Sequence, residues 1–429
     1  MEKIHIFYDN RMIAELQRKD EDVFDLIYTS EWKQNGFAFS PRLPLHGNYS
    51  PKDVKNFFLN LLPEGDALDT LSKLCQISKA NSFGLLRAIG AETSGALSFG
   101  MGSMMETSFR PVSLEELEER IRHRTKTPIT LWDEKVRLSL AGVQEKLPIV
   151  YIDHQFGFGE GDFASTHILK FSHDNTLVLN EFLSLELAKM AKLPVNQATI
   201  QILADEPVLM VERFDRKIDP TTHTVKKHHV IDGCQLLSMS PSYKYERNFG
   251  SGRDVKDIRE GVSFQRLMLH KNSMQVPALF IQQFIDWSLI NLCLGNSDAH
   301  GKNISFFIDA ARNLSLTPFY DIVNIHLYPH YAHELAMAFG DEFEIGQIKA
   351  YDLAYHCRLL NIKPALLITR FHTITKQIHK GLETRTLMDP LLEINAPFCE
   401  QYTQDVLTRI EKLNDVFEAL KNNSFEGYF

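Results

Sequence analysis

The stretch GNSDAHGKN, residues 295–303, gathers polar side chains at the end of a strongly apolar run. Asp298, His300, Lys302 and Asn303 lie almost next to one another in it. Clusters of this kind usually cap and turn the chain, bind a metal, or take part in phosphate chemistry. The rest of the sequence has to distinguish between these functions.

A transition-metal site is poorly supported by these residues. Zinc sites combine about four His, Cys or carboxylate ligands, often at close spacing. Asp298 and His300 stand here without a second His or Cys, and the 17 histidines of the chain are scattered. We therefore expect no dedicated transition-metal centre in this stretch.

Phosphoryl transfer requires a carboxylate near the attacking hydroxyl, ligands for Mg²⁺, and a cation on the nucleotide phosphates. Mg²⁺ prefers oxygen ligands, which Asp and Asn supply. In protein kinases one loop provides an Asp and, a few residues later, an Asn, and a second metal-binding Asp follows a hairpin. Asp298 and Asn303 have this order and spacing, and Asp321 follows a predicted hairpin. Lys170, in the strand-like HILKFS, supplies the upstream cation.

Each of these residues also has a simpler structural explanation. Asp298 could be a loop residue, Asn303 a turn residue, and Asp321 the N-cap of a helix that begins at IVNIH. Lys170 could be an ordinary surface lysine on a strand. For any one residue this explanation stays open, but the order of all four, with suitable elements between them, favours phosphate chemistry.

The first part of the chain, up to about residue 100, mixes strand and helix patterns. Pro51 is well placed in the first turn of a helix. The patterns predict strands at 3–9, 11–17, 22–29 and 37–45, helices at 51–74 and 81–90, and a return to small and apolar residues at 95–100.

The middle of the chain is expected to form a sheet with one packed helix, and the last part to be helical. Ser113 is a suitable N-cap for a short amphipathic helix at 113–124. The run 277–296 is apolar on nearly all sides, which indicates a buried helix. The other predicted elements are strands at 146–152, 167–172, 198–203 and 207–215, a helix at 180–193, a hairpin from 304–308 to 314–322, and helices from 350 onward.

Composition narrows the class of protein. The chain has 429 residues with 44% hydrophobic and 24% charged, an ordinary globular composition. A net charge of −9 argues against nonspecific binding to nucleic acid or anionic membranes. The five cysteines are far apart with no CxxC pair, which favours a reducing compartment. Since we find no signal peptide and no run long enough to span a membrane, we expect a cytoplasmic location.

With these residues in place, the chain resembles the HipA family of bacterial toxin serine/threonine kinases from type II toxin-antitoxin systems. FFLNLLPEG and GALSF are similar to the family's N-terminal domain. SLAGVQEK, THILKF, NEFLSLELAKMAKLPV, VERFDR, GNSDAHGKN and LTPFYDIV are similar to its kinase core, in the family's order. The resemblance covers nearly the whole length.

The resemblance implies an α+β protein with a protein-kinase-like two-lobed fold and an additional N-terminal α/β subdomain. The small lobe would be β-rich and the large lobe helical. The implied domains are an N-terminal HipA-type subdomain at 1–105, a small lobe with phosphate loop and hinge at 106–215, and a helical large lobe with the catalytic loop at 216–429.

The resemblance also implies an ATP- and Mg²⁺-dependent kinase with a role for each site residue. Asp298 would activate the acceptor hydroxyl, and Asn303 and Asp321 would bind Mg²⁺. Lys170 would contact the ATP phosphates. The other nucleotide-binding positions that it implies are Glu212 and Phe214 in the hinge, Gln235, Gly142 and Val143 in the phosphate loop, His300 and Asp321 itself.

The phosphate loop SLAGVQEK departs from eukaryotic kinases, which have a G-x-G-x-x-G loop and an H-R-D motif. It has only Gly142. Ser139 matches the family's autophosphorylation site, and a phosphate of about −1.5 to −2 charge beside ATP would expel the loop by repulsion. From the residues alone, Ser139 is more simply a strand or turn residue.

Two further assignments depend on the same resemblance. Glu181 and Glu186 both lie in the helix that would supply a partner for Lys170, and we prefer Glu181 because it is beside Asn180 at the helix start. His300 would either orient the loop through a backbone hydrogen bond or contact phosphate.

The family's biology implies a toxin that phosphorylates a translation component, such as an aminoacyl-tRNA synthetase. A small helix-turn-helix antitoxin, similar to HipB, would neutralise it and would be its only route to DNA, and no membrane partner is expected. Two other functions stay open: a small-molecule phosphotransferase of the aminoglycoside-kinase type, and a nucleotide-binding pseudokinase that acts as a scaffold.

Overall fold

The chain folds as a mixed α+β protein in two compact units, which are described one at a time. The strand-rich unit comprises Met1–Val178, Gln197–Pro241 and Phe306–Leu314, and the helical unit comprises Leu179–Asn196, Ser242–Ser305 and Ser315–Phe429. The computed structural model describes residues 2–20, 23–90, 92–100, 107–133, 135–137, 145–160, 163–172, 176–219, 224–309, 311 and 313–425.

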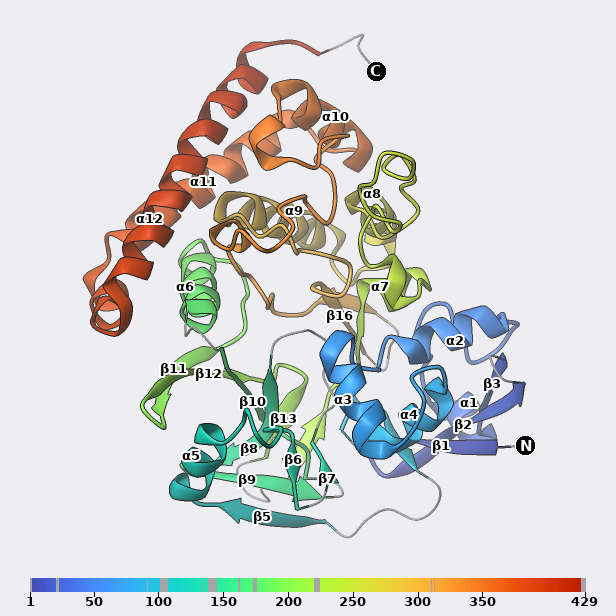
Figure 1. Ribbon diagram of the computed structural model, residues 1–429. Helices are drawn as coiled ribbons and strands as arrows, with labels where there is room; N and C mark the ends of the chain where they lie inside the picture. Colours follow the sequence, from blue (N-terminus) through green and yellow to red (C-terminus); the bar gives the residue numbers. More distant parts are fainter. Residues whose placement is uncertain are drawn as a thin grey trace. The chain divides into compact units, whose positions relative to one another are not determined.

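The strand-rich unit begins with an antiparallel sheet in the order β3-β2-β1-β4. The turn between β1 and β2 has positive φ at both Asp9 and Asn10, as a tight hairpin requires. Helices α1–α4 accompany this sheet (Figure 1). The bounds are β1 Glu2–Tyr8, β2 Arg11–Asp20, β3 Val23–Tyr28, α1 Ser30–Asn35, α2 Pro51–Leu59, α3 Gly65–Cys75, α4 Ser82–Ile89 and β4 Ser98–Gly100.

Two predictions for this region are wrong. No strand forms at 37–45, because Pro41 and Pro44 cannot donate to a ladder. Its apolar residues, such as Phe39, are buried in irregular chain instead. The predicted helix at 51–74 is two helices, since Pro63 lies between α2 and α3.

The second sheet of this unit has the order β11-β12-β10-β8-β9-β5. The amphipathic helix α5 covers it, with Ser113 as N-cap as predicted (Figure 1). Leu117 and Ile121 of α5 pack on Ile149 and Leu169 of the sheet, and each such buried side chain contributes about 1.5–3 kcal/mol. The bounds are β5 Ser108–Val112, α5 Leu114–Arg122, β8 Lys146–Ile152, β9 Gln155–Glu160, β10 His167–Lys170, β11 Ala198–Leu203 and β12 Glu206–Glu212.

Strand β9 was not predicted, because Gly157 and Gly159 interrupt its apolar pattern. A Cβ at Gly157 would come within 2.3 Å of the Phe109 ring on the paired strand, so glycine is needed there. The smaller elements of this unit are β6 Leu131–Trp132, β7 Lys135–Val136, β13 Arg216–Ile218, β14 Val225–Lys227, β15 Val230–Asp232 and α7 Gly233–Leu237; a short 3-10 helix, Pro241–Tyr243, follows.

The helical unit is built around α9, whose residues Phe284–Leu294 are all buried. Helices α11 and α12 pack on it and on each other (Figure 1). Its helices are α6 Thr176–Met190, α8 Phe264–Met268, α9 Pro277–Leu294, α10 Ala350–Leu360, α11 Pro364–Leu382 and α12 Arg385–Asn422, with 3-10 turns at Leu269–Ser273, Ile325–Leu327 and Ile345–Gln347. The hairpin strands β16 Ser305–Ile308 and β17 Leu314–Leu316 follow α9 in the sequence, and their residues Phe306–Leu314 belong to the strand-rich unit.

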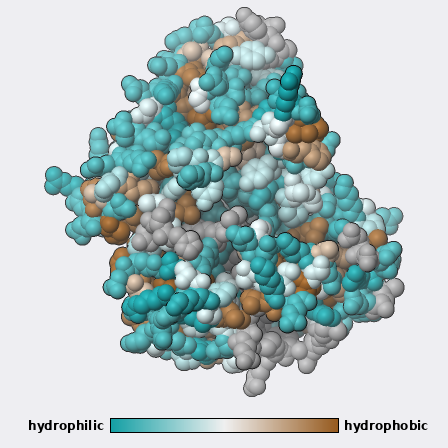
Figure 2. All heavy atoms as spheres, in the orientation of Figure 1, coloured by the Kyte–Doolittle hydropathy of each residue, from teal (hydrophilic) through white to brown (hydrophobic). Residues whose placement is uncertain are grey.

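On the face of the protein shown in Figure 2, apolar side chains form small groups among polar ones. Within the described ranges, no helix combines the length and apolar character that crossing a membrane would require.

Candidate active site

The polar cluster of the sequence begins where α9 ends. Gly295 has a φ of 74° and closes the helix: its N–H donates to Leu292 O, and the Asn296 N–H donates to Asn291 O. This pair of bonds is a Schellman motif, which favours glycine at the left-handed position. A Cβ on Gly295 would also come within 2.5 Å of the Arg409 guanidinium. The end of α9 therefore fixes the position at which the loop 296–303 begins.

The Asn296 side chain holds this loop against the segment that carries Asp321. Its Nδ2 donates to Asn291 Oδ1 at 2.7 Å and to Asp321 O at 3.2 Å. Its Oδ1 accepts the Asp298 N–H at 3.2 Å. One buried carboxamide therefore links the end of α9 with Asp298 and Asp321. Asn296 was not assigned a role from the sequence.

Asp298 and Asn303 lie together inside the loop. The Asn303 side-chain amide donates to Asp298 O at 2.9 Å, and the His300 N–H donates to the same carbonyl at 2.8 Å. Since Asn303 uses its nitrogen for this bond, its Oδ1 points the other way. Asp298 is partly exposed, while Asn303 is buried. The carboxylate can meet a substrate while its backbone is fixed.

His300 is a neutral, orienting residue in this geometry. Burial, with help from Lys244 and Lys302, holds the pKa of His300 well below its ordinary value. Its Nδ1 accepts the Lys302 N–H at 3.2 Å, so the ring proton is on Nε2. The backbone bond that the sequence left as one alternative for His300 is therefore present.

Tyr245 contacts Asp298 directly, although no sequence pattern pointed to it. Its hydroxyl donates to Asp298 Oδ1 at 2.6 Å, and its ring meets the His300 ring edge-on at 5.2 Å. The adjacent Lys244 O accepts the Gly301 N–H, which fastens the tyrosine segment to the loop. Tyr245 is 37% exposed, so it stands at the accessible side of the carboxylate.

Asp321 is not a helix N-cap, so that simpler explanation is wrong. The chain continues without regular structure to a 3-10 turn that Asn324 precedes. Asp321 has a φ of 54°, a conformation that costs a non-glycine residue about 1–2 kcal/mol. Strained backbone of this kind concentrates at functional sites. The hydrogen bond from Asn296 Nδ2 to the Asp321 carbonyl helps to hold this backbone in place.

Helix α6 is fastened to the same segment. Asn180 Nδ2 donates to Asn324 O at 3.0 Å, and the Asn324 N–H donates to Asn180 Oδ1 at 2.7 Å. The next residue, Glu181, is 1% exposed. Glu186 instead forms a partly exposed ion pair with Lys189 at 3.1 Å. Of the two glutamates, only Glu181 is placed in the interior.

In the strand-rich unit, Lys170 ends β10. Leu169 belongs to the core beneath the sheet, and because side chains alternate along a strand, Lys170 points to the opposite face. Its register partner on β12 is Leu209. Lys170 is only 5% exposed. A lysine this buried is unusual at an ordinary surface position, which argues against the simpler explanation.

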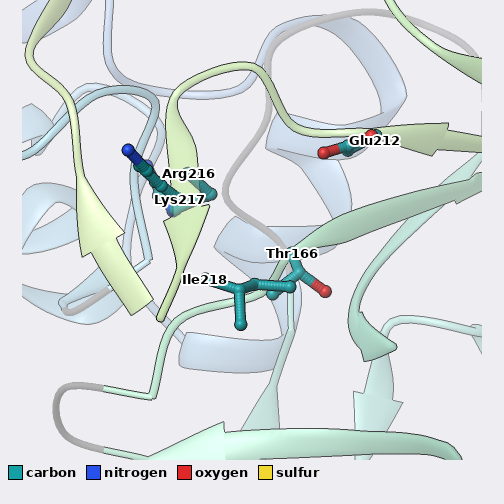
Figure 3. Close-up of a pocket in the computed structure, with 5 residues that line it drawn as sticks. All are labelled: Thr166, Glu212, Arg216, Lys217 and Ile218. Carbon is teal, nitrogen blue, oxygen red and sulfur yellow. The ribbon is translucent and has the colours of Figure 1, made fainter. Parts of the chain in front are cut away.

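The predicted hinge follows β12. Glu212 is exposed, and its N–H donates to Gln197 O. The Phe214 ring packs edge-on against Phe307. Glu212 also lines a polar pocket of about 240 Å³ together with residues from beside β10 and from β13 (Figure 3). The other lining residues are Thr166, Arg216, Lys217 and Ile218.

Gln235 is buried in a capping box at the start of α7. Its Oε1 accepts the Asp232 N–H, and its Nε2 donates to Phe57 O at 3.1 Å. Both ends of its carboxamide therefore bond within the protein. Ser139, Gly142 and Val143 of the predicted phosphate loop lie outside the described residues.

The donor set in the helical unit fits Mg²⁺ better than a transition metal. Among the described residues, no group of three or more His, Cys, Asp or Glu side chains could hold a metal ion. The oriented Asn303 oxygen and the Asp321 carboxylate are oxygen donors, which Mg²⁺ prefers while it keeps several of its waters.

Comparison with known proteins identifies the family. Residues 4–100 match the HipA N-terminal domain, and residues 138–381 match the HipA-like C-terminal domain. The chain belongs to the HipA family. The serine/threonine-protein kinase toxin HipA of Shewanella oneidensis is 42% identical over 405 residues, which are 94% of this chain and 93% of that protein.

Two further comparisons agree with this assignment. A putative kinase of Sinorhizobium fredii is 28% identical over 360 residues, 81% of this chain and 83% of its own. The solved structure of Shewanella oneidensis HipA with HipB and its operator DNA superposes with a TM-score of 0.88 at 39% identity, covering 98% of this chain and 100% of that one.

As a HipA-family member, this chain is a serine/threonine-protein kinase of a toxin-antitoxin system. The match to the HipA N-terminal domain counts against a small-molecule phosphotransferase. The predicted residues are divided between the two units. The helical unit holds Asp298, His300, Asn303, Asp321 and Glu181, and the strand-rich unit holds Lys170, Glu212, Phe214 and Gln235.

Proposed function

We propose that this kinase transfers the γ-phosphate of ATP to a serine of a protein, with Asp298 orienting and deprotonating the acceptor hydroxyl. The observation that carries this proposal is the loop geometry: Asn303 and His300 fix the Asp298 backbone while its carboxylate stays accessible. Positioning and charge stabilisation supply most of the rate in phosphoryl transfer.

Asn303 and Asp321 are the proposed Mg²⁺ ligands. Mg²⁺ held by these two side chains would help to neutralise the charge that develops on the phosphate. The Asn296 carboxamide keeps Asp321 in register with the loop, because it bonds to both. His300, neutral and protonated on Nε2, can donate a hydrogen bond toward phosphate without adding charge.

In the strand-rich unit, Lys170 is the proposed partner of the ATP phosphates, with Glu181 of α6 as its counter-ion. The burial of Glu181 and the surface pairing of Glu186 support this choice. Glu212 and Phe214 would bind adenine through backbone groups, and Gly142 and Val143 would cover the phosphates. Gln235 is the weakest of these assignments, since its carboxamide already bonds on both sides.

These assignments extend to the architecture. We propose a two-lobed kinase with domains at 1–105, 106–215 and 216–429. The proposed location is the cytoplasm. The proposed partner is a HipB-like antitoxin, through which the complex would reach DNA. This proposal is supported by the solved complex of Shewanella oneidensis HipA with HipB and its operator DNA. The proposed acceptor is a translation component such as an aminoacyl-tRNA synthetase.

The test of this function is phosphate transfer from γ-labelled ATP to proteins of a bacterial lysate, with the labelled residue identified by mass spectrometry. Asp298→Asn should reduce the rate by about 10²–10⁴-fold, the usual contribution of a general base. Asp389→Asn, the same change at an exposed position of α12, should leave it unchanged. Full labelling by Asp298→Asn would refute the role, and no labelling by the wild type would favour a pseudokinase.

The same experiment reports on the phosphate loop. We propose Ser139 as the autophosphorylation site, where the added negative charge would expel the loop from beside ATP. Mass spectrometry of the labelled kinase should find phosphate on Ser139 in the wild type and none in Asp298→Asn. Phosphate elsewhere, with Ser139 unmodified, would contradict the assignment.

A further inference from the structure

Three charged side chains of the hinge segment are buried, and the proposed function gives none of them a role. Arg213, Asp215 and Arg216 are each no more than 6% exposed. Burial of charges in such close succession is unfavourable unless each is paired and hydrogen-bonded. Their partners come from the loop that ends the HipA N-terminal domain.

Glu92 in this loop pairs with both arginines. Its Oε1 lies 2.8 Å from Arg213 Nη1 and 3.3 Å from Arg216 Nη2. The carbonyl of Thr93 accepts from the same two side chains at 3.1 and 2.8 Å. Asp215 completes the cluster, at 2.8 Å from each arginine, so two positive and two negative charges balance.

Gly95 closes the loop over the hinge. Its N–H donates to Asp215 Oδ2 at 2.7 Å, and its carbonyl accepts from Arg216 Nη1 at 2.8 Å. Its φ is 79°, and a Cβ there would lie 3.0 Å from Val230 O. Only glycine allows this close approach without a shift of the loop.

The Glu92 carboxylate also reaches the strand that carries the proposed phosphate-binding lysine. Its Oε2 accepts the Ser165 N–H at 3.0 Å, and its Oε1 accepts from the Ser165 hydroxyl at 2.9 Å. Ser165 lies just before β10. One carboxylate therefore bonds both to the start of the lysine strand and to the arginines that flank Phe214.

The electrostatics agree with this geometry. Burial alone would raise the pKa of Asp215, but Arg213 and Arg216 hold it well below its ordinary value. Burial acts in the same way on Glu92, and the same two guanidinium groups again lower its pKa. Both carboxylates are therefore ionised at neutral pH, as the ion pairs require.

We propose that Glu92 is a positioning residue for nucleotide binding, which sets the backbone of the adenine hinge from the N-terminal domain. The inference rests on the proposed hinge at Glu212 and Phe214. It gives the N-terminal domain a part in nucleotide selection: the loop at 92–95 would fix the carbonyl and amide groups that distinguish adenine from guanine.

The experiment is calorimetric titration of the full-length protein with ADP and with GDP. Glu92→Gln keeps the shape of the side chain but removes its charge. It should weaken ADP binding about tenfold, the effect of one misplaced hydrogen bond, and narrow the preference for ADP over GDP. If Glu92 only stabilised the fold, Glu92→Gln would lower the melting temperature and the fraction of protein able to bind nucleotide. The folded fraction would then keep the wild-type affinity for ADP and the wild-type preference for ADP over GDP.

Two further variants keep the test decisive. Gly95→Ala disturbs the same loop without a change of charge and should narrow the same preference, so it decides the outcome if Glu92→Gln does not fold. Glu206→Gln breaks the ion pair with Arg124 at the far end of β12 and should leave the preference intact.

The outcomes separate the inference from the proposed function. If the wild type binds no ADP, the proposed nucleotide site is wrong. If the wild type prefers ADP while folded Glu92→Gln and Gly95→Ala bind both nucleotides as it does, only the role of Glu92 is overturned.

Discussion

Asp298 is held on two sides, by the Asn303 amide at its carbonyl and by the Tyr245 hydroxyl at its carboxylate. The second contact fixes the rotation of the carboxylate, which a base needs if it is to face one acceptor hydroxyl. The phenol thus orients the proposed base without belonging to the loop.

Removal of this hydroxyl gives a prediction at the residue scale. Tyr245→Phe should lower kcat by about 10–100-fold and leave the KM for ATP unchanged, because a hydrogen bond to a charged group is worth about 1.5–3 kcal/mol and the ring still packs on His300. Tyr331→Phe, at an exposed tyrosine of the same unit, is the matched control. Steady-state kinetics with wild-type kcat in Tyr245→Phe would exclude this role.

Residue types and spacing were sufficient to single out Asp298, Asn303 and Asp321 as candidates, since the order of oxygen ligands repeats a known arrangement, and their roles stay predictions. They could not show Tyr245, which lies in an irregular segment far upstream and reaches the loop only through tertiary structure. Asn296 stood in the quoted motif, but an asparagine after a helix-ending glycine is so common in turns that its spacing carries no signal.

At the scale of elements, hydrophobic periodicity predicted the long segments well. The buried helix α9, the helices after residue 350 and strands β8 and β11 appear where the patterns placed them. The predictions failed where proline or glycine interrupted the pattern. Pro41 and Pro44 prevent the predicted strand, and Pro63 separates α2 from α3. The glycines of β9 break its apolar alternation, so this strand was not predicted. Apolar residues bury themselves in irregular chain too, so their density alone does not define a strand.

Helix α10 carries a buried histidine that makes the stability of the helical unit sensitive to acid. His356 is 1% exposed between the rings of Phe264 and Phe339, and burial lowers its pKa to about 3. The ordinary value in an unfolded chain is about 6.5. Between these values the unfolded chain binds the extra proton, so stability is full above about pH 6.5 and is lost as the pH falls below it.

His356→Phe should therefore flatten the pH dependence of unfolding. Below about pH 6, the wild type should lose up to about 1.4 kcal/mol per pH unit more than the variant, the value for one proton. Urea titrations at pH 7 and pH 5 measure this difference. Replacement of the exposed His330 should leave the slope unchanged, and an equal slope in His356→Phe would contradict the assignment.

At the scale of the whole molecule, the family resemblance was specific enough to be confirmed, because several motifs fall in one order along nearly the entire chain. Periodicity alone would have given only a strand-rich part and a helical part. The ion cluster of Glu92, Arg213, Asp215 and Arg216 could not be predicted, since its partners lie far apart in the sequence and charged residues are usually exposed.

The central claim is that Lys170 and Asp321 are both needed to bind a Mg²⁺–nucleotide. It is tested most directly by calorimetric binding of a non-hydrolysable ATP analogue, with and without Mg²⁺. Lys170→Met should weaken binding by about 10–100-fold, while Lys226→Met at an exposed position should not. Asp321→Asn should abolish the gain in affinity that Mg²⁺ gives the wild type. Wild-type affinity and wild-type Mg²⁺ dependence in both Lys170→Met and Asp321→Asn would contradict the account.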